Sequence, residues 1–357
     1  MAEVKIHIDR IYDNIEAIHA LMQKNDKQWS LVVKCLGGER DVIARVLKHP
    51  LISKIHSVSS SHWQELSLVK ELHGNLRTIV IRPTFKLEAA ETVSSSDISL
   101  ETSLASIQCL NESARSVGKT HSIIVMIEMG DLREGIKREG LIPFYNNIFE
   151  LKNIRIVGIG ANLGCMFGDL PTYDKLLHLV LYGQLLEAKY DHKLELISGG
   201  TSITLPLLDT GEVPIGVNHF RIGEAVFLGT TPFTNKRYAN LHTNCIEFEA
   251  NILELYRKES LPEKKIRLRT KGAGKLTSGE YGSYKALVDF GKIDVDPRNL
   301  ISIDKKVKFF GNSSDLSVYD LGENSQGYNV GDVLTFRLNY MGVAQLMNSK
   351  YIKKTML

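Results

Sequence analysis

Three segments of this sequence carry side chains that could do chemistry. Lys34 ends the apolar run SLVVKC, and a lysine held partly out of water is suited to forming a Schiff base with an aldehyde. The segment SGGTS, residues 198–202, combines two glycines with three hydroxyls, and such a loop can wrap around a phosphate. Arg221 begins the segment RIGEA. Each segment also has an ordinary interpretation: a lysine reaching solvent, a simple turn and a structural salt bridge.

The elements that must position these residues alternate between strand-like and helix-like patterns. Eight short β-rich runs are separated by stretches such as HWQELSLVKELHG, whose apolar residues recur every three or four positions. Eight strand–helix repeats predict an α/β fold, a (β/α)8 barrel of TIM type with parallel strands. A doubly wound open sheet, which alternates in a similar way, is the alternative. The eight runs are Gln28–Cys35, Lys54–Ser59, Arg77–Arg82, Asp97–Leu100, Ser122–Glu128, Ile154–Asn162, Lys193–Ser198 and His219–Phe227.

A barrel would bring the three segments together, because active sites of barrels lie at the C-terminal ends of the strands. Lys34 follows the first run, SGGTS follows the seventh and Arg221 lies in the eighth. The loops after strands 7 and 8 are a common phosphate site in barrels. A lysine after strand 1 and a phosphate cradle after strands 7 and 8 are the layout that pyridoxal 5′-phosphate needs.

The pattern changes from about Ala239. Strand-like segments follow one another with turns and no long helix: IEFEANILELYR, KIRLRT, KALVDFGKIDV, KKVKFFG, LSVYDL and DVLTFRLNYM. This predicts a small all-β domain over residues 239–357, after a barrel domain over residues 1–238. Residues 1–10 are a candidate extra strand of the β domain.

Composition excludes several classes of protein. The 357 residues hold 44 Lys plus Arg against 41 Asp plus Glu, a net charge of +3, which gives no case for a nucleic-acid or membrane partner. No apolar run reaches the roughly 18–20 residues that span a bilayer, and the N-terminus MAEVKIHIDR has no apolar signal core. The four cysteines are far apart, which argues against disulfides and a metal site. We therefore expect a cytoplasmic enzyme without a metal. The cysteines are Cys35, Cys109, Cys165 and Cys245.

The chain resembles the alanine racemase-like, fold-type III pyridoxal-phosphate enzymes, and among them the ornithine racemase-like amino acid racemases. The resemblance implies an enzyme that interconverts L- and D-amino acids (ornithine, alanine or another) by moving the Cα proton. It also implies a homodimer in which the β domain of one subunit closes the barrel mouth of the other. The segments that carry it, in the family's order, are VVKCLGGE, SDISLET, EMGDLREGI, GIGANLGC, ISGGTSITL, NHFRIGEAVFLG, GNSSDLSVYDL and YNVGDVLTFRLNYMG.

The resemblance also implies roles for individual residues. Lys34 resembles the lysine that is linked to the cofactor and serves as one of two racemisation bases. Arg221 resembles the arginine that faces the pyridine nitrogen and keeps it unprotonated. Arg133 matches an arginine that approaches the substrate carboxylate, and Asn162 takes the place of a residue near the cofactor's ring hydroxyl. Residues implied for the cofactor's phosphate and its loop are Ser198, Gly200, Thr201, Ser202, Ile222, Gly223 and Tyr340, the last of which could instead be a core aromatic residue on a strand.

The second base is the main departure from the family's pattern. The family uses a tyrosine from the partner's β domain, and here the segment GAGKLTSGEYGSYKALVDF offers Tyr281, which we prefer, and Tyr284. Ser314 and Asp315 are further candidates, and without a second base a one-base racemase or a protein that only binds the cofactor stays open. A basic substrate would favour an acidic group near the site, for which the sequence offers Glu128, Asp131, Glu134 and Asp315.

Four other functions compete with a racemase. A non-catalytic pyridoxal-phosphate homeostasis protein would lack the β domain. A fold-type III decarboxylase would have a late cysteine, and no cysteine follows Cys245; a D-threonine aldolase-like lyase would have a late histidine–cysteine pair, and all 11 histidines lie at or before His242. A barrel without a cofactor is the fourth. The amino acid racemase accounts for more of the sequence than any of them.

Overall fold

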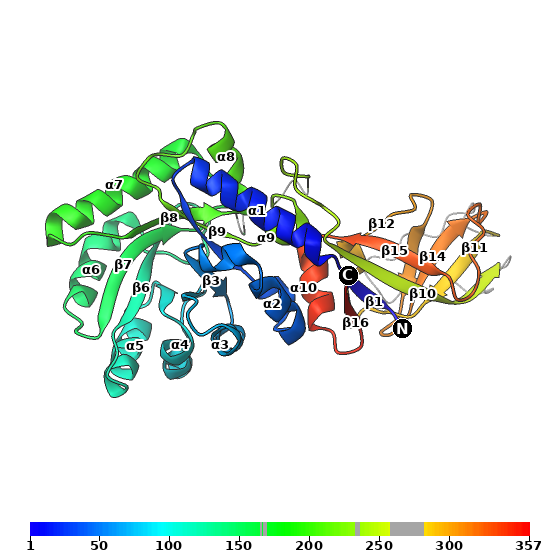
Figure 1. The fold of residues 1–357 in the computed structure, drawn as a ribbon, viewed down its shortest axis with the longest axis horizontal. Helices are drawn as coiled ribbons and strands as arrows, with labels where there is room; N and C mark the ends of the chain where they lie inside the picture. The colour runs from blue at the N-terminus through cyan, green and yellow to red at the C-terminus, as the bar shows by residue number, and fades with distance from the viewer. Residues whose placement is uncertain (165, 167–169, 233–235, 258–281) are drawn as a thin grey trace. The chain divides into compact units, whose positions relative to one another are not determined.

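Eight parallel strands close into a barrel within residues 10–243 (Figure 1). The closing pair is β2 with β9, in register from Gln28 opposite His219 to Leu31 opposite Ile222. This computed structural model describes residues 1–164, 166, 170–232, 236–257 and 282–357. The predicted barrel is confirmed, and the open sheet is wrong because its two outer strands would not pair. The strands are β2 (Gln28–Val32), β3 (Ser57–Ser60), β4 (Thr78–Val80), β5 (Ile98–Glu101), β6 (His121–Ile127), β7 (Ile154–Ala161), β8 (Leu196–Thr201) and β9 (His219–Ile222).

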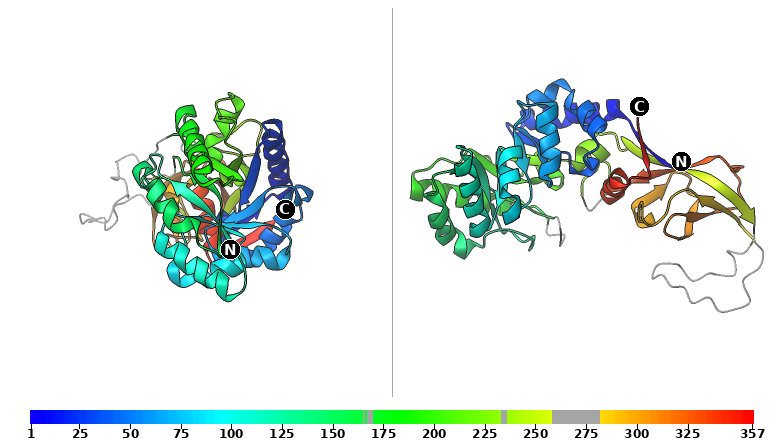
Figure 2. Two further views of the ribbon diagram at one scale, coloured as in Figure 1. Left: turned by 90° about the vertical axis from the view of Figure 1, so that its left-hand side faces the viewer. Right: turned by 90° about the horizontal axis from the view of Figure 1, so that it is seen from below.

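Helices surround these strands (Figure 2). Helix starts follow the sequence closely: the side chain of Ser103 caps α5 and that of Thr172 caps α7. The predicted eighth strand is half wrong, because it ends at Ile222 and the apolar run AVFL after Gly223 is helical and buried. The helices are α1 (Ile8–Lys24), α2 (Arg40–Leu47), α3 (Trp63–Leu72), α4 (Ala89–Ser95), α5 (Leu104–Ser116), α6 (Leu141–Phe149), α7 (Tyr173–Tyr190), α8 (Leu205–Asp209) and α9 (Glu224–Leu228).

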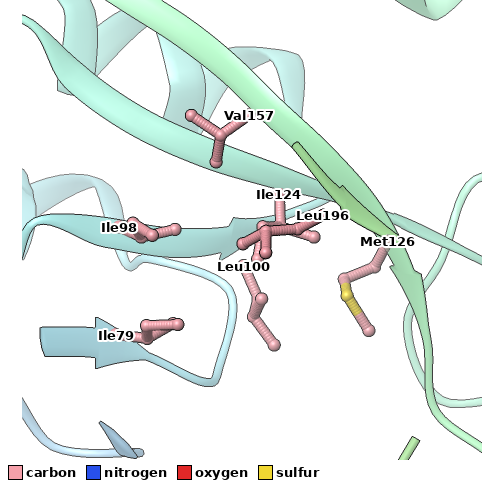
Figure 3. Close-up of a cluster of buried hydrophobic side chains, with 7 residues drawn as sticks. All are labelled: Ile79, Ile98, Leu100, Ile124, Met126, Val157 and Leu196. Atoms are coloured by element: carbon pink, nitrogen blue, oxygen red, sulfur yellow. The ribbon is translucent and has the colours of Figure 1, made fainter. Parts of the chain in front are cut away.

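A cluster of buried apolar side chains joins strands β4 to β8 (Figure 3). Each member is at most 4% exposed, and burying one such side chain contributes roughly 1.5–3 kcal/mol. The cluster therefore holds these strands together, whereas β2, β3 and β9 carry polar side chains that are described below. The members are Ile79, Ile98, Leu100, Ile124, Met126, Val157 and Leu196.

Glu101, at the end of β5, gives the barrel a pH-dependent stability. Its carboxylate is buried and accepts hydrogen bonds from the Thr84 hydroxyl (2.5 Å) and the Thr84 backbone N–H (3.3 Å). Burial outweighs these bonds and raises its pKa to about 7. The folded protein thus holds a proton that the unfolded chain releases at lower pH. The resulting stabilisation is fully present below the unfolded carboxyl's pKa and is lost as the pH rises through about 7.

Glu101→Gln is therefore expected to remove part of the loss of stability between pH 5 and pH 8. The amide keeps an acceptor for Thr84 but has no proton to lose, so the variant should be more stable than the parent at pH 8, by on the order of 2 kcal/mol. Urea unfolding at both pH values measures this difference. Glu112→Gln, at an exposed position on α5, is the control, and equal pH profiles for Glu101→Gln and the parent would contradict the assignment.

The second unit, Met1–Asp9 with Asn244–Leu357, is a mostly antiparallel β structure. Its strands lie in the order β12-β15-β10-β11-β14-β13, and β1 (Glu3–Ile6) pairs with both β10 and β16. The predicted β domain after the barrel is confirmed, while the predicted segment KIRLRT lies outside the described residues. The remaining elements are β10 (Ile246–Arg257), β11 (Tyr284–Val288), β12 (Leu300–Ser302), β13 (Lys308–Asn312), β14 (Ser317–Gly322), β15 (Val333–Leu338), α10 (Tyr340–Asn348) and β16 (Lys353–Met356).

Helix α10 departs from the predicted succession of strands. The strand expected to continue to Met341 ends at Leu338, because the side chain of Asn339 accepts a hydrogen bond from the Gly342 N–H and caps a helix. Tyr340 is the first residue of that helix rather than a residue within a strand. Among the described helices of both units, none combines the length and the apolar composition needed to cross a membrane.

Candidate active site

Arg221 is the buried cation of the barrel mouth. It lies on β9 and is 2% exposed. Its Nη1 donates to Ser198 Oγ on β8 at 2.5 Å, and its Nη2 donates to the Ala161 backbone oxygen at 2.9 Å and to Asn162 Oδ1 at 2.7 Å. These acceptors carry no charge and belong to β8, to the last residue of the neighbouring strand β7 and to the residue that follows β7. Because both arms of the planar guanidinium are anchored, its orientation in the mouth is fixed.

Glu134 binds both Arg133 and Asn162, and Asn162 in turn accepts a hydrogen bond from Arg221. Arg133 lies in the loop after β6, with its side chain 40% exposed, and donates to Glu134 from Nη2 at 2.7 Å and also from Nε. Asn162 Nδ2 donates to the same carboxylate. Burial acts to raise the pKa of Glu134, but the hydrogen bonds and charge of Arg133, the Asn162 bond and the charge of Arg221 hold it below its usual range. An ionised carboxylate therefore lies between the two arginines.

Lys34 lies just after β2, the strand that pairs with the Arg221-bearing strand β9. It is half-buried and begins the short helix η1 (Lys34–Leu36), directly after β2. Leu31 on β2 is opposite Ile222 on β9, so Lys34 and Gly223 emerge from neighbouring strands at the same end. Nearby Glu65 is buried, which raises its pKa to about 7 against the hydrogen bond with Ser60 and the charge of Lys34.

Two glycine-containing segments lie at the same end of the barrel as Lys34, one at the end of β8 and one directly after β9. Gly200, at the end of β8, has φ +127°, and a Cβ there would lie 2.4 Å from Thr204 Oγ1. A Cβ on Gly223 would lie 2.9 Å from the Val32 backbone oxygen. Buried Ser202, which begins η5 (Ser202–Thr204), accepts a hydrogen bond from the Ala225 N–H at 3.2 Å and ties the two loops together. The close backbone of these loops fits a small anion such as a phosphate.

The structure thus brings most of the predicted site residues to one end of the barrel. Thr201 is opposite Arg221 in the β8–β9 register, and Ile222 follows Arg221 on β9. The predicted residues gathered there are Lys34, Arg133, Asn162, Ser198, Gly200, Thr201, Ser202, Arg221, Ile222 and Gly223.

The candidates for the second base belong to the other unit. Tyr340 also lies in that unit, at the start of α10. Tyr281 lies outside the described residues. Tyr284 begins β11, and its ring lies 5.5 Å from the Arg257 guanidinium. Ser314 and Asp315 occupy the turn between β13 and β14, where the Ser314 hydroxyl donates to Asp315 at 2.5 Å.

Three of the four carboxylates considered for a basic substrate support the loop after β6 instead. Glu128 Oε1 accepts from the backbone N–H groups of Gly130 (2.6 Å) and Leu132 (3.2 Å). Asp131 is 1% exposed and accepts from the Met166 N–H at 3.0 Å. Glu134 binds Arg133 and Asn162, as described above. Asp315, in the second unit, is exposed.

Sequence reasoning missed two residues of this network. It considered Glu134 only as a substrate-binding carboxylate and did not foresee its link to Asn162. It also passed over His219, a wholly buried residue whose Nδ1 lies 2.9 Å from Ser198 Oγ. The signal for His219 was present: residues two apart on a strand share a face, and His219 precedes Arg221 by two.

Comparisons with known proteins agree with this geometry. The family described as alanine racemase, N-terminal domain, matches residues 6–231. One similar sequence is an ornithine racemase of Acetoanaerobium sticklandii, which is 30% identical over 356 residues, covering 99% of both chains. Another is a lysine racemase of Thermotoga maritima, which is 36% identical over 249 residues, covering 69% of this chain and 68% of that chain. The alanine racemase of Bartonella henselae with covalently bound pyridoxal phosphate shares the fold, with TM-score 0.74 and 15% identity over 100% of this chain and 99% of that chain.

Barrel, site and relatives define the class of protein as a racemase. The chain belongs to the alanine racemase N-terminal domain family. The resemblance predicted from the sequence is confirmed, and the two racemase relatives favour racemisation over the carrier, decarboxylase and lyase alternatives.

Proposed function

We propose that this racemase uses pyridoxal 5′-phosphate and acts on a basic amino acid. The single observation that carries the cofactor assignment is the fixed, buried Arg221 beside a half-buried Lys34 and two closely packed glycine loops. The basic substrate is supported by the relatives named for ornithine and lysine. The cytoplasmic location expected from the sequence is part of the same proposal, and the free thiols of Cys35, Cys109 and Cys245 fit it.

The residues at the mouth suit each part of this cofactor. The loops around Gly200, Thr201, Ser202 and Gly223, with Ile222, would hold the phosphate, and Tyr340 is proposed as a further phosphate contact. Ser198 and Asn162 would act by holding Arg221 for the ring nitrogen, and Asn162 would also approach the ring hydroxyl. When bound, the cofactor supplies an electron-withdrawing ring that acidifies the Cα–H bond of a linked amino acid.

Each cation at the mouth has a separate task. Lys34 holds the cofactor in the resting enzyme and then takes or returns the Cα proton on one face of the substrate. Arg221, permanently charged and bound to the Ser198, Ala161 and Asn162 oxygens, would keep the ring nitrogen of the bound cofactor free of a proton. Arg133 binds the substrate carboxylate, and its bonds to Glu134 orient it for that contact.

Incubation of each L-amino acid with the enzyme in heavy water tests the proposal directly. Ornithine and lysine are expected to gain deuterium at Cα while the solution loses optical rotation, and alanine to react more slowly. An enzyme that exchanges and inverts no amino acid when supplied with pyridoxal phosphate would overturn the function. Faster reaction of alanine would overturn the basic substrate alone.

Gly200→Ala tests the proposed phosphate loop. The new Cβ meets Thr204 and sits on a backbone of positive φ, which L-residues adopt at a cost of about 1 kcal/mol. The loop must shift, so the dissociation constant of pyridoxal phosphate is expected to rise roughly tenfold or more. Gly118→Ala is the matched control, since Gly118 also has positive φ (+65°) but open space around it. Equal cofactor affinity in the two variants would contradict the assignment.

A homodimer is proposed from the exposed apolar side chains around the mouth. The loops after β4, β6 and β7 all lie at the C-terminal end of the barrel and carry large apolar side chains in solvent. A partner's β domain would cover them and exclude water from the site. Sedimentation of the purified enzyme measures this state. The side chains are Phe85 (58% exposed), Leu87 (82%), Leu132 (70%), Met166 (60%) and Leu170 (55%).

A further inference from the structure

A hydrogen-bonded chain of buried side chains continues inward from Arg221. Ser198 Oγ, which accepts from Arg221, lies 2.9 Å from His219 Nδ1. His219 Nε2 lies 2.7 Å from Ser30 Oγ on β2, and Ser30 Oγ lies 2.5 Å from Ser57 Oγ on β3. His219, Ser30 and Ser198 are wholly buried and Ser57 is 1% exposed. Four neighbouring strands of the barrel are therefore joined behind the guanidinium.

This series of hydrogen bonds ends at the opposite end of the barrel. Ser57 Oγ lies 3.1 Å from His56 Nδ1, and exposed Arg77 donates from Nη1 to His56 Nε2 at 2.9 Å. Burial first and the charge of Arg77 second lower the pKa of His56 to about 4. Burial, with repulsion from His56 and Arg221, lowers the pKa of His219 well below its usual range. Both imidazoles are thus neutral at physiological pH.

A neutral imidazole suits the place of His219 between two hydroxyls. One ring nitrogen donates and the other accepts, and a serine hydroxyl can do either, so both nitrogens are satisfied in either tautomer. Ser198 in turn has His219 on one side and Arg221 on the other. The hydroxyl that anchors Nη1 of Arg221 is therefore itself held in place by His219.

A second buried histidine shows what is particular to His219. His121, at the start of β6, is 2% exposed and lies 3.0 Å from Ser99 Oγ on the adjacent strand. Burial lowers its pKa to about 4. His121 and His219 thus share burial, neutrality, a place at the start of a strand and a serine partner. Only the serine beside His219 is an acceptor for Arg221.

We propose that His219 is a positioning residue, which fixes the ring-facing orientation of Arg221 through Ser198. The proposal rests on the proposed cofactor only for its catalytic consequence, because the bonds themselves belong to this chain. Without the Ser198 hydroxyl in place, Nη1 would lose this anchor, and the guanidinium would be less firmly oriented.

Two substitutions of His219 separate positioning from packing. The amide oxygen of His219→Asn can replace Nδ1 and keep the bond to Ser198, whereas the longer side chain of His219→Gln can reach the place of Nε2 and keep only the bond to Ser30. His121→Asn is the control for loss of a buried imidazole. Ser198→Ala removes the acceptor of Arg221 while leaving His219 in place.

The readouts are melting temperature, the visible spectrum of the holoenzyme, cofactor affinity and labelling of Arg221 by phenylglyoxal in protein freed of cofactor. His219→Gln and Ser198→Ala are expected to shift the spectrum, weaken cofactor binding roughly tenfold and expose Arg221 to the reagent. His219→Asn should restore the parental spectrum, and His121→Asn should lower the melting temperature without a spectral shift.

Two outcomes would overturn the proposal. His219→Gln with the parental spectrum and a protected Arg221 would leave His219 with a packing role only. Equal spectra and equal labelling of Arg221 in His219→Asn and His219→Gln, changing only with their melting temperatures, would also leave His219 with a packing role. If neither variant folds, labelling of Arg221 that is unchanged in Ser198→Ala decides against the proposal. Phenylglyoxal labelling needs no cofactor, so a failure of the proposed function would be seen separately, as a parent protein that binds no pyridoxal phosphate.

Discussion

Lys34→Ala is expected to abolish racemisation, lowering kcat by roughly 10⁴-fold or more. The methyl group can neither hold the cofactor covalently nor carry the Cα proton, so two tasks are lost together. The fold should persist, because Lys34 is half-buried in a short helix after β2 rather than part of the apolar cluster. Borohydride treatment followed by peptide mapping should find the cofactor fixed on Lys34 in the parent enzyme and on no lysine in the variant.

Lys27→Ala is the matched control for this experiment. Lys27 lies at the other end of β2, just before Gln28, and burial lowers its pKa. Its ammonium donates to the Ile215 backbone oxygen at 3.3 Å. The control should keep both the activity and the borohydride adduct of the parent. Cofactor fixed to another lysine in an active Lys34→Ala enzyme would refute the assignment.

Tyr281→Phe is expected to have the second-largest effect, slowing racemisation by roughly 10²- to 10⁴-fold, the contribution of a general acid–base group. Removing only the hydroxyl leaves Lys34 able to exchange the proton on its own face. Deuterium should therefore still enter one enantiomer at Cα while inversion nearly stops. Tyr284→Phe is the control, and a larger loss in that variant would transfer the role to Tyr284.

Mixing the two inactive variants tests whether both residues serve one shared site. If Tyr281 comes from the partner subunit, a hybrid dimer of Lys34→Ala and Tyr281→Phe contains one site with both native residues. Random reassortment should then restore roughly a quarter of the parental activity. No recovery after verified subunit exchange would place both residues in the same subunit or exclude Tyr281.

Much of the fold could be predicted because the barrel depends on repeated local patterns. Each predicted run of the barrel overlaps an observed strand, since alternation of short apolar runs with amphipathic helices is visible in any single stretch. The seventh strand was predicted to end at Ser198 but continues to Thr201, so most of SGGTS belongs to β8. Two further errors occurred where one residue changes the local conformation. Gly223 ends β9 before an apolar run that then forms α9, and Asn339 caps a helix in a segment that reads as a strand.

The site was predictable in its parts but not in its connections. Lys34, Arg221 and the SGGTS segment stand out by residue type and by their place at the ends of predicted strands. The bonds from Arg221 to Ala161 and Asn162, and from Asn162 to Glu134, join residues on different strands or directly after them. Such bonds depend on the stagger between strands as the barrel closes, which no single segment encodes.

The pairing of β1 with β16 affects how the chain is made. The Thr355 hydroxyl donates to Glu3 at 2.7 Å across 352 positions of sequence, and strands β1 and β16 run side by side. A nascent chain emerging from the ribosome can complete the barrel, whose strands β2 to β9 all lie within residues 10–243, well before β16 is synthesised. Strand β1 must therefore wait for β16, which is made much later. We expect the β unit to mature only once β16 has been synthesised, with β1 an open edge that chaperones or proteases can recognise until then.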